Sequence, residues 1–412
     1  IDNIDAVIIT HAHLDHCGSL PLLFKYGYRG PIYCTSPTRD LMALVLYDYL
    51  EVTRRSGNIP FFGEREIKNI LLHTIPLNYK TIADISPDVK LTFYNAGHIL
   101  GSAMVYLTIT SDNGAPHSIL FTGDFKFGWS RVLDRPPYSF HRLDTLIMES
   151  TYGGRKDTPF SRQDAEALLA KIVKRTIERG GKVLIPVLSL GRAQEIMLTL
   201  EEKMSSNLLP KIPVYIDGMS YEATAIHLAY PEFFSSELRK RILVNGENPF
   251  RSEYFTLVKG YNAREEVYSG GPCIIIASSG MLTGGPSVEY FRVLASDEKN
   301  TIIFVSFQAK GTLGRLVQDG AKEVIVPSID SKPERVKVNL EVRKIEGFSG
   351  HSDRLQLLSF AFRINPKPSK ILLFHGEEKK SVELAVDLAS ALKSHQIEVY
   401  SLSNLDAVSL KV

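Results

Sequence analysis

The sequence has few cysteines, no long apolar run and almost no net charge. Its 412 residues include only Cys17, Cys34 and Cys273, and their wide spacing excludes a disulfide framework and a Cys-x-x-Cys zinc site. Apolar runs such as Cys273–Ala277 and Ile302–Val305 fall far short of the roughly 18 residues that span a bilayer. We therefore expect no membrane partner and a reducing, cytoplasmic setting.

The charge balance gives no sign of a nucleic-acid-binding surface. There are 48 Lys+Arg against 46 Asp+Glu, a formal net charge of +2. A hydrophobic content of 44% and a charged content of 23% exclude a disordered or collagen-like chain. At roughly 100–200 residues a domain, the length suggests two or three domains. The chain begins at Ile1, within a strand-like approach to a motif, so we expect the start of the native protein to be missing.

Short aliphatic runs alternate with helical patterns along most of the chain. Ser36 is expected to cap a helix that continues to about Glu51, and Ser161 with Asp164 approximates a capping box. This alternation predicts an α/β protein with at least two sheets. The runs expected as strands buried on both faces are Ala6–Thr10, Ser118–Thr122, Thr145–Met148, Lys182–Leu188, Cys273–Ser278, Thr301–Phe307 and Ile371–His375.

Two stretches resemble linkers and suggest how the chain divides. One is Gly153–Pro159, and the other is the region near 327–345, which is rich in Lys, Arg and Pro. We expect residues 1–155 and 346–412 to form one domain, because residues 156–345 contain a strand–helix–strand unit of their own. The middle segment is therefore predicted to be an inserted domain.

The strongest chemical signal is the segment His11-Ala12-His13-Leu14-Asp15-His16, directly after a predicted strand. On a loop at a strand end, three imidazoles and a carboxylate can converge on one point, and they are suitable ligands for zinc. A polar surface loop is the alternative, but alternating histidines with an acid rarely arise by accident.

Three further candidates lie at other strand-like ends. His98 comes shortly after Leu91–Tyr94, Asp124 follows Ser118–Thr122, and His375 ends the run that begins at Ile371. In open α/β sheets, ligands gather at the carboxyl ends of strands, although each of these residues alone could be a cap or a surface residue. Seven candidate ligands suit two zinc ions better than one. An aspartate that bridges two cations would hold them about 3.5–4 Å apart, as in two-metal hydrolysis.

This pattern resembles the metallo-β-lactamase superfamily, through HxHxDH at residues 11–16, His98, and Asp124 in a Thr-Gly-Asp context. Glu149, His351 and His375 resemble motifs A, B and C of its β-CASP branch. The resemblance is closest to the archaeal form of the cleavage and polyadenylation specificity factor nuclease. It is carried there by segments 189–195, 279–286 and 308–315.

The resemblance implies an αββα sandwich with an inserted Rossmann-like β-CASP domain. The family's first motif, an Asp on an earlier strand, is missing, as are the RNA-binding KH domains that archaeal members often carry upstream. Both absences fit an N-terminally truncated chain.

The resemblance also implies a role for each motif residue. Two zinc ions are expected, one held by His11, His13, His98 and Asp124, the other by Asp15, His16, Asp124 and His375. Asp15 is a ligand first and a candidate for orienting the nucleophile. His351 is the candidate general acid for the leaving 3′-oxygen, held by Glu149. The alternatives are that His351 caps the following helix and that Glu149 is a surface acid.

Glycine-rich turns in the middle segment are candidates for RNA or phosphate binding. Ser279 and Gly280 follow a predicted strand, and Pro286 begins the next helix, as in a phosphate cradle at a helix N-terminus. Arg192 and Arg315 follow glycines and could clamp phosphates. Tight strand–helix connections explain these turns equally well.

Together these features predict a zinc-dependent endoribonuclease, with 5′–3′ exonuclease activity as a further possibility, that acts on single-stranded RNA. We expect it in RNA 3′-end processing or transcription termination, with the RNA-processing or transcription machinery as partner and a homodimer by analogy. One alternative is a small-substrate hydrolase of the same superfamily, which the inserted domain argues against. A non-catalytic RNA-binding scaffold is another, but it would require damaged ligands.

Overall fold

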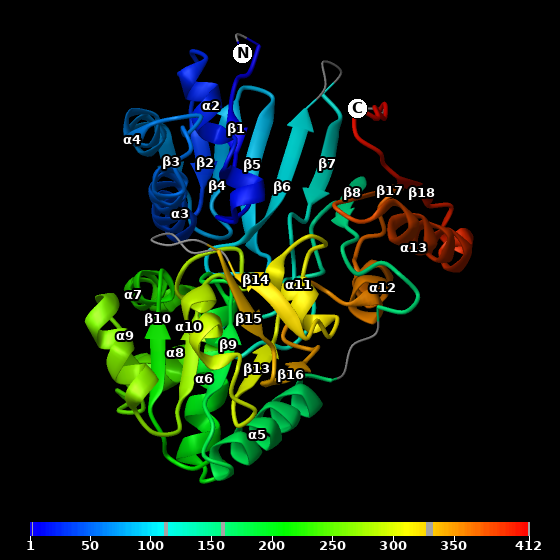
Figure 1. Ribbon diagram of the computed structural model, residues 1–412. Helices are drawn as coiled ribbons and strands as arrows, with labels where there is room; N and C mark the ends of the chain where they lie inside the picture. Colours follow the sequence, from blue (N-terminus) through cyan, green and yellow to red (C-terminus); the bar gives the residue numbers. More distant parts are fainter. Residues whose placement is uncertain (2, 111–113, 158–160, 327–332, 411–412) are drawn as a thin grey trace. The chain divides into compact units, whose positions relative to one another are not determined.

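The computed structural model describes residues 1, 3–110, 114–157, 161–326 and 333–410 (Figure 1). The chain divides into two compact units. Unit 1 comprises Ile1–Arg54, Asn58–Thr158 and Gly350–Val412, and unit 2 comprises Arg55–Gly57 and Pro159–Ser349. The two predicted linkers fall partly on residues 158–160 and 327–332, outside the described residues.

Unit 1 contains two β-sheets. The smaller is parallel, with strands β1 (Val7–Ile8), β2 (Ile32–Cys34) and β3 (Thr74–Pro76) in that order. The larger is parallel from β18 to β7 and antiparallel from β7 to β4. Its order is β18 (Glu398–Ser401), β17 (Lys370–Phe374), β8 (Thr145–Glu149), β7 (Pro116–Phe121), β6 (Ala103–Thr110), β5 (Val89–Asn95) and β4 (Ile82–Ser86).

Apolar side chains pack on both faces of the larger sheet. Tyr33 of the small sheet joins Phe93 and Val105 of the large one in a single buried cluster. On the other face, Leu146 and Ile371 pack with apolar residues of α12 (Arg354–Arg363) and α13 (Glu378–Ala391). Helices α3 (Ser36–Arg55) and α4 (Glu64–His73) lie beside the small sheet, and α1 (Leu14–Cys17) and α2 (Leu20–Lys25) precede β2 (Figure 1). This layering is the predicted αββα sandwich.

Unit 2 is built on a six-stranded parallel sheet, a Rossmann-like arrangement. The strand order is β11 (Phe255–Leu257), β10 (Val214–Asp217), β12 (Ile274–Ala277), β9 (Val183–Pro186), β13 (Thr301–Phe304) and β16 (Glu341–Lys344). A hairpin of β14 (Glu323–Val326) and β15 (Glu334–Lys337) precedes β16. The helices are α5 (Arg162–Glu178), α6 (Arg192–Ser205), α7 (Ser220–Ala229), α8 (Ser236–Leu243), α9 (Gly260–Ser269), α10 (Pro286–Leu294) and α11 (Leu313–Gln318).

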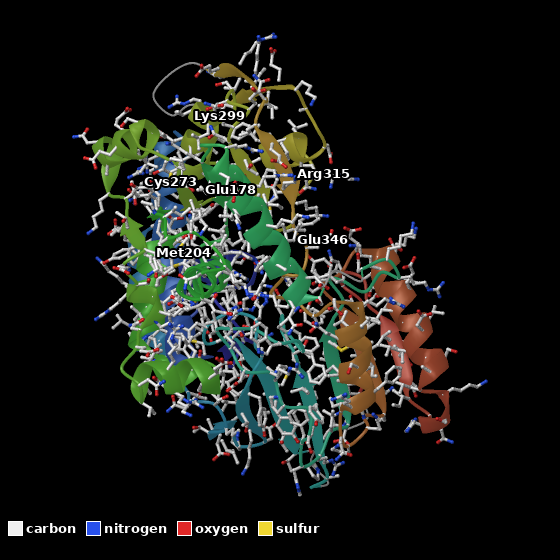
Figure 2. All side chains as sticks on the ribbon, turned by 90° about the horizontal axis from the view of Figure 1, so that it is seen from below. Glu178, Met204, Cys273, Lys299, Arg315 and Glu346 are labelled. Carbon is white, nitrogen blue, oxygen red and sulfur yellow. The ribbon has the colours of Figure 1, made fainter. Side chains whose placement is uncertain are left out.

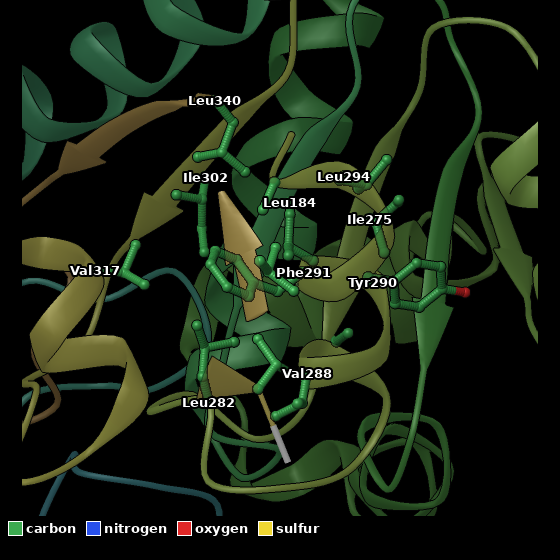
Figure 3. Packing of buried hydrophobic residues seen from close by; sticks show 14 of the residues in the cluster. Leu184, Ile275, Leu282, Val288, Tyr290, Phe291, Leu294, Ile302, Val317 and Leu340 are labelled. Atoms are coloured by element: carbon green, nitrogen blue, oxygen red, sulfur yellow. The ribbon is translucent and has the colours of Figure 1, made fainter. Parts of the chain in front are cut away.

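The central strands of unit 2 are buried on both faces, as their continuous apolar runs predict. Leu184, Ile275 and Ile302 share one buried cluster with Phe291 and Leu294 of α10 (Figure 3). The predicted α/β class with more than one sheet is confirmed, although most strands are one to several residues shorter than their apolar runs.

The predicted N-terminal cap is confirmed for α5 and is wrong for α3. Ser161 caps α5, and its Oγ accepts a hydrogen bond from the Asp164 amide at 3.1 Å. Ser36, in contrast, already lies inside α3. Thr35 Oγ1 accepts from the Thr38 amide at 3.3 Å, so a neighbouring hydroxyl supplies the cap that was assigned to Ser36.

The three cysteines are buried free thiols, and Figure 2 shows Cys273 within unit 2. Burial raises the pKa of Cys17 and Cys34 to about 12 and that of Cys273 to about 11, which keeps these thiols protonated. In the described part of the chain, no helix has both the length and the apolar character needed to cross a membrane.

Candidate metal centre

The candidate ligands lie where strands of unit 1 end. His98 follows β5, Asp124 follows β7 and His375 follows β17. These three strands run in the same direction, so their carboxyl ends meet at one edge of the large sheet. His11 and His13 follow β1 of the small sheet, and Asp15 and His16 lie on α1 directly after them.

Four of these residues form a first group, His11, His13, His98 and Asp124, whose nearest ligand atoms all lie within 4.8 Å of one another. His98 Nε2 is 3.0 Å from His13 Nδ1, and His11 Nε2 is 3.5 Å from Asp124 Oδ2. Zinc bonds of about 2.0–2.1 Å place tetrahedral ligands roughly 3.4 Å apart, which matches these separations. All members except His13 are buried.

A second group consists of Asp15, His16 and His375, also within 4.8 Å of one another. Asp15 Oδ2 is 3.6 Å from His16 Nε2 and 3.7 Å from His375 Nε2. This group is more exposed, since the Asp15 side chain is 65% accessible. Asp124 contacts both groups, because its Oδ2 is 3.3 Å from His16 Nε2 and its Oδ1 is 3.2 Å from His375 Nδ1. The bridging position predicted for Asp124 agrees with this geometry.

The unsatisfied polar atoms of the site test whether a cation fits. Among the described residues, His11 Nε2, His13 Nε2, His16 Nε2 and Asp124 Oδ1 are buried and have no hydrogen-bond partner. A buried polar group without a partner costs about 1–3 kcal/mol, and here four such atoms gather in two adjoining groups. Imidazole nitrogens and carboxylate oxygens are donors that zinc accepts. The residues therefore fit a metal.

Burial keeps the first group in the protonation state that binds metals. Desolvation lowers the pKa of His11 and of His98, and neighbouring histidines add to the effect. Desolvation also lowers the pKa of His13 to about 4. These imidazoles are therefore neutral near pH 7, as a metal ligand must be.

The second group is held by charge. The charged contact with His375 lowers the pKa of Asp15 to about 2, and the same contact raises the pKa of His375 to about 9. Burial alone would raise the pKa of Asp124, but the contact with His16 and the charges of the surrounding histidines lower it. Both carboxylates are thus ionised and available as ligands.

Neighbouring groups that are not ligands contact the ligand rings and orient them, and these contacts were not predicted from the sequence. Thr10 Oγ1 lies 3.0 Å from His11 Nδ1, and the carbonyl oxygen of Gly350 lies 2.9 Å from His98 Nδ1. Thr151 Oγ1 lies 3.2 Å from His375 Nδ1. Such partners fix ring orientation and ligand basicity. Thr10 is adjacent to the first motif, but nothing in the sequence points to a carbonyl 252 residues from His98.

The predicted His351–Glu149 pair is present in the structure. His351 Nδ1 lies 3.0 and 3.1 Å from the two carboxylate oxygens of Glu149. Burial opposes protonation of His351, but the charge and hydrogen bond of Glu149 raise its pKa overall. Glu149 is fully buried and accepts from the Phe125 amide at 2.8 Å, so it is not a surface acid. The reading of His351 as a helix cap is also wrong, because Asp353 caps α12.

Two further residues attach His351 to the Asp124 segment, and sequence reasoning missed both. Lys126 Nζ donates to the carbonyl oxygen of His351 at 2.9 Å. Ser352 Oγ donates to the Phe125 carbonyl at 2.9 Å and accepts from the Phe127 amide at 2.8 Å. Nothing in the sequence marks Lys126, but its burial in the structure points to this contact, since buried charges are rare without a specific partner.

The candidate RNA-binding residues lie in unit 2, where their hydrogen bonds are largely structural. Ser279 Oγ accepts from the Thr283 amide at 2.9 Å, and the Gly280 carbonyl accepts from Gln308 Nε2 at 2.9 Å. Arg192 begins α6. Arg315, labelled in Figure 2, lies on α11. Its Nε is 2.7 Å from Asp319 Oδ2. Their RNA-binding role stays a prediction.

Three family models match the chain. Residues 1–128 match the metallo-β-lactamase superfamily domain, and residues 193–317 match the Beta-Casp domain. Residues 335–401 match the Zn-dependent metallo-hydrolase RNA specificity domain. The resemblance to this superfamily and its β-CASP branch is therefore confirmed over most of the chain.

Curated archaeal relatives match the whole chain. The chain is 51% identical over 412 residues to the transcription termination factor FttA of Methanocaldococcus jannaschii. The aligned region covers 100% of this chain and 64% of that protein. The chain is 50% identical over 410 residues to FttA of Pyrococcus horikoshii, and the aligned region covers 99% of this chain and 62% of that protein. The chain is 48% identical over 411 residues to FttA of Lokiarchaeum, and the aligned region covers 100% of this chain and 64% of that protein. The chain thus spans less than two thirds of the length of these relatives.

Proposed function

We propose that this chain, which belongs to the β-CASP branch of the metallo-β-lactamase superfamily, is a zinc-dependent ribonuclease that cleaves phosphodiester bonds of single-stranded RNA. The observation that carries the proposal is the arrangement of seven candidate ligands around one shared aspartate, Asp124, beside the His351–Glu149 pair. We propose unit 2 as the inserted β-CASP domain.

The two groups would hold one zinc ion each. His11, His13 and His98 would bind the first, and Asp15, His16 and His375 the second, with Asp124 contributing an oxygen to each. When bound, zinc supplies an activated water near neutral pH and neutralises charge on the phosphoryl oxygens. Asp15 is ionised and exposed, so it is able to accept a hydrogen bond from the attacking water and orient it.

His351 would protonate the leaving 3′-oxygen. Its Nδ1 faces Glu149, so Nε2 is the ring nitrogen left to deliver a proton. The carboxylate favours the protonated ring and fixes its orientation, which are the two properties that a general acid needs. Lys126 holds the backbone of the same residue in place.

The substrate and partners follow from the family context. The matched RNA specificity domain and the termination-factor names of the relatives support RNA as substrate and transcript 3′ ends as the place of action. We propose an association with the transcription or RNA-processing machinery. A homodimer stays a prediction.

End-labelled linear RNA and a circular RNA of the same sequence test the proposal. The zinc-loaded chain should cleave both, since an endonuclease needs no free end, and removal of zinc should stop both reactions. Linear substrates with a 5′-monophosphate or a 5′-hydroxyl then report any 5′–3′ exonuclease activity. Cleavage that continues at full rate after both metals are removed would contradict the proposal.

A further inference from the structure

The segment between Asp124 and Glu149 contains one exposed indole. In the stretch 125–133, Phe125, Phe127, Val132 and Leu133 are at most 8% exposed, whereas Trp129 is 40% exposed. Arg131 places its guanidinium carbon 5.2 Å from the centroid of the Trp129 ring. The loop therefore buries its other large apolar side chains and presents an aromatic face with a cation beside it.

Both ends of this loop, residues 126–134, are hydrogen-bonded to segments that carry residues of the site. At its start, the Phe127 amide donates to Ser352, the residue after His351. At its end, the Asp134 carbonyl accepts a hydrogen bond at 2.7 Å from the side chain of Asn95, which lies three residues before His98. Consecutive Cα atoms are about 3.8 Å apart, so the Cα of Trp129 lies within about 8 Å of that of Phe127. The backbone at Trp129 is thus only a few residues away from hydrogen bonds to the segments that carry His98 and His351.

The loop is held in shape by its own contacts. The Leu133 amide donates to Ser130 Oγ at 3.2 Å. Gly128 lies so close to α12 that an added Cβ would be 2.5 Å from Gln356 Nε2. The backbone on both sides of Trp129 is therefore held in place. An aromatic side chain on a fixed backbone loses little conformational entropy when a flat ligand stacks on it.

We propose that Trp129, with Arg131, forms a stacking subsite for a nucleobase of the single-stranded RNA near the cleaved phosphodiester. The inference rests on the proposed ribonuclease function and adds a binding residue outside the metal and acid groups. Exposed bases stack on aromatic rings and on guanidinium planes regardless of base identity. Such a subsite would hold RNA without requiring the basic surface that the net charge of +2 does not provide.

Trp129 is the only tryptophan of the chain, so its fluorescence reports this position alone. The experiment uses the zinc-loaded chain with His351→Ala, which should bind RNA without cleaving it during the titration. A labelled single-stranded RNA of about 12 nucleotides is added while RNA anisotropy and tryptophan emission are both followed. Emission should be quenched in step with the anisotropy.

Variants in the same background measure the contribution of the ring. Trp129→Ala should weaken RNA binding about 5- to 100-fold, whereas Trp129→Phe, which keeps an aromatic face, should stay within about threefold of the parent. The matched control is Tyr400→Ala. Tyr400 is 39% exposed on the edge strand β18 and also has a cation, Lys370, near its ring, so its loss should leave RNA binding unchanged. Zinc content and thermal stability should not change in any variant.

A scan with abasic nucleotides identifies the stacked base. One abasic position should abolish quenching, and Trp129→Ala should then cost no further affinity for that RNA, because both changes remove the same contact. Saturating RNA that leaves the emission unchanged, equal affinity of Trp129→Ala and the parent, or no RNA binding at all would overturn the proposal. Failure of the ribonuclease function is read separately, from cleavage by the unsubstituted chain.

Discussion

The two candidate metal-binding groups of unit 1 share Asp124 but are built differently. The first, with His11, His13 and His98, is mostly buried, and its ring nitrogens face one another at distances that already suit a cation. The second, with Asp15, His16 and His375, is partly exposed and held by a charged contact between Asp15 and His375.

This difference indicates different tasks. A buried group of neutral imidazoles is preorganised for tight binding, because little has to move or lose a proton when the metal enters. A more exposed group beside it would leave a bound metal accessible to substrate and solvent. We therefore expect the first zinc ion to bind tightly and to support the fold, and the second to bind more weakly and to complete the reaction centre.

The largest effect is expected from breaking the first group. His13→Ala should lower RNA cleavage by more than about ten-thousandfold, because a catalytic cation contributes several kcal/mol of charge stabilisation. It should also lower the zinc content measured by atomic absorption. His141→Ala, at an exposed histidine outside both groups, is the matched control and should change neither. An active, zinc-replete His13→Ala protein would remove this residue from the ligand set.

The next largest effect should come from the acid, which lies outside both groups. His351→Ala should slow cleavage about a hundred- to ten-thousandfold, the usual contribution of general acid catalysis, while two zinc ions stay bound. Glu149→Gln should slow it less, because the ring keeps a hydrogen-bond partner but loses the carboxylate charge. If either variant loses zinc, the residue is a ligand and its assigned role is wrong.

Smaller effects should separate the two groups through the hydroxyls behind them. Thr10→Val removes the partner of His11, and Thr151→Val removes that of His375. Each should weaken zinc binding about ten- to a hundredfold, and only in its own group. Calorimetric titration of the metal-free variants measures both affinities. Equal weakening of both zinc ions by one substitution would mean that the groups are not independent.

Much of this centre could be predicted from the sequence, because each ligand follows an apolar run. HxHxDH, His98, Asp124 and His375 all lie at strand ends, and the parallel direction of these strands brings them together. The alternation of strands and helices predicted the α/β class with at least two sheets, whereas the αββα sandwich and the Rossmann-like sheet of unit 2 were implied by the family resemblance.

Contacts between distant backbone segments could not be predicted in this way. The Gly350 carbonyl on His98 and the Lys126 ammonium on the His351 carbonyl depend on the path of the folded chain, not on residue type. The cap of α3 moved from Ser36 to Thr35 because two adjacent hydroxyl residues offer equivalent signals. The exposure of Trp129 could not be predicted, because the sequence does not show which of the apolar residues near it are buried.

Stepwise addition of zinc to the metal-free chain, with bound zinc and RNA cleavage measured together, tests whether the second zinc ion completes the reaction centre. We expect two equivalents of zinc to bind, the first more tightly and with little activity, and cleavage to rise with the second. Full cleavage without zinc, or full cleavage after one equivalent with no further binding, would contradict this expectation.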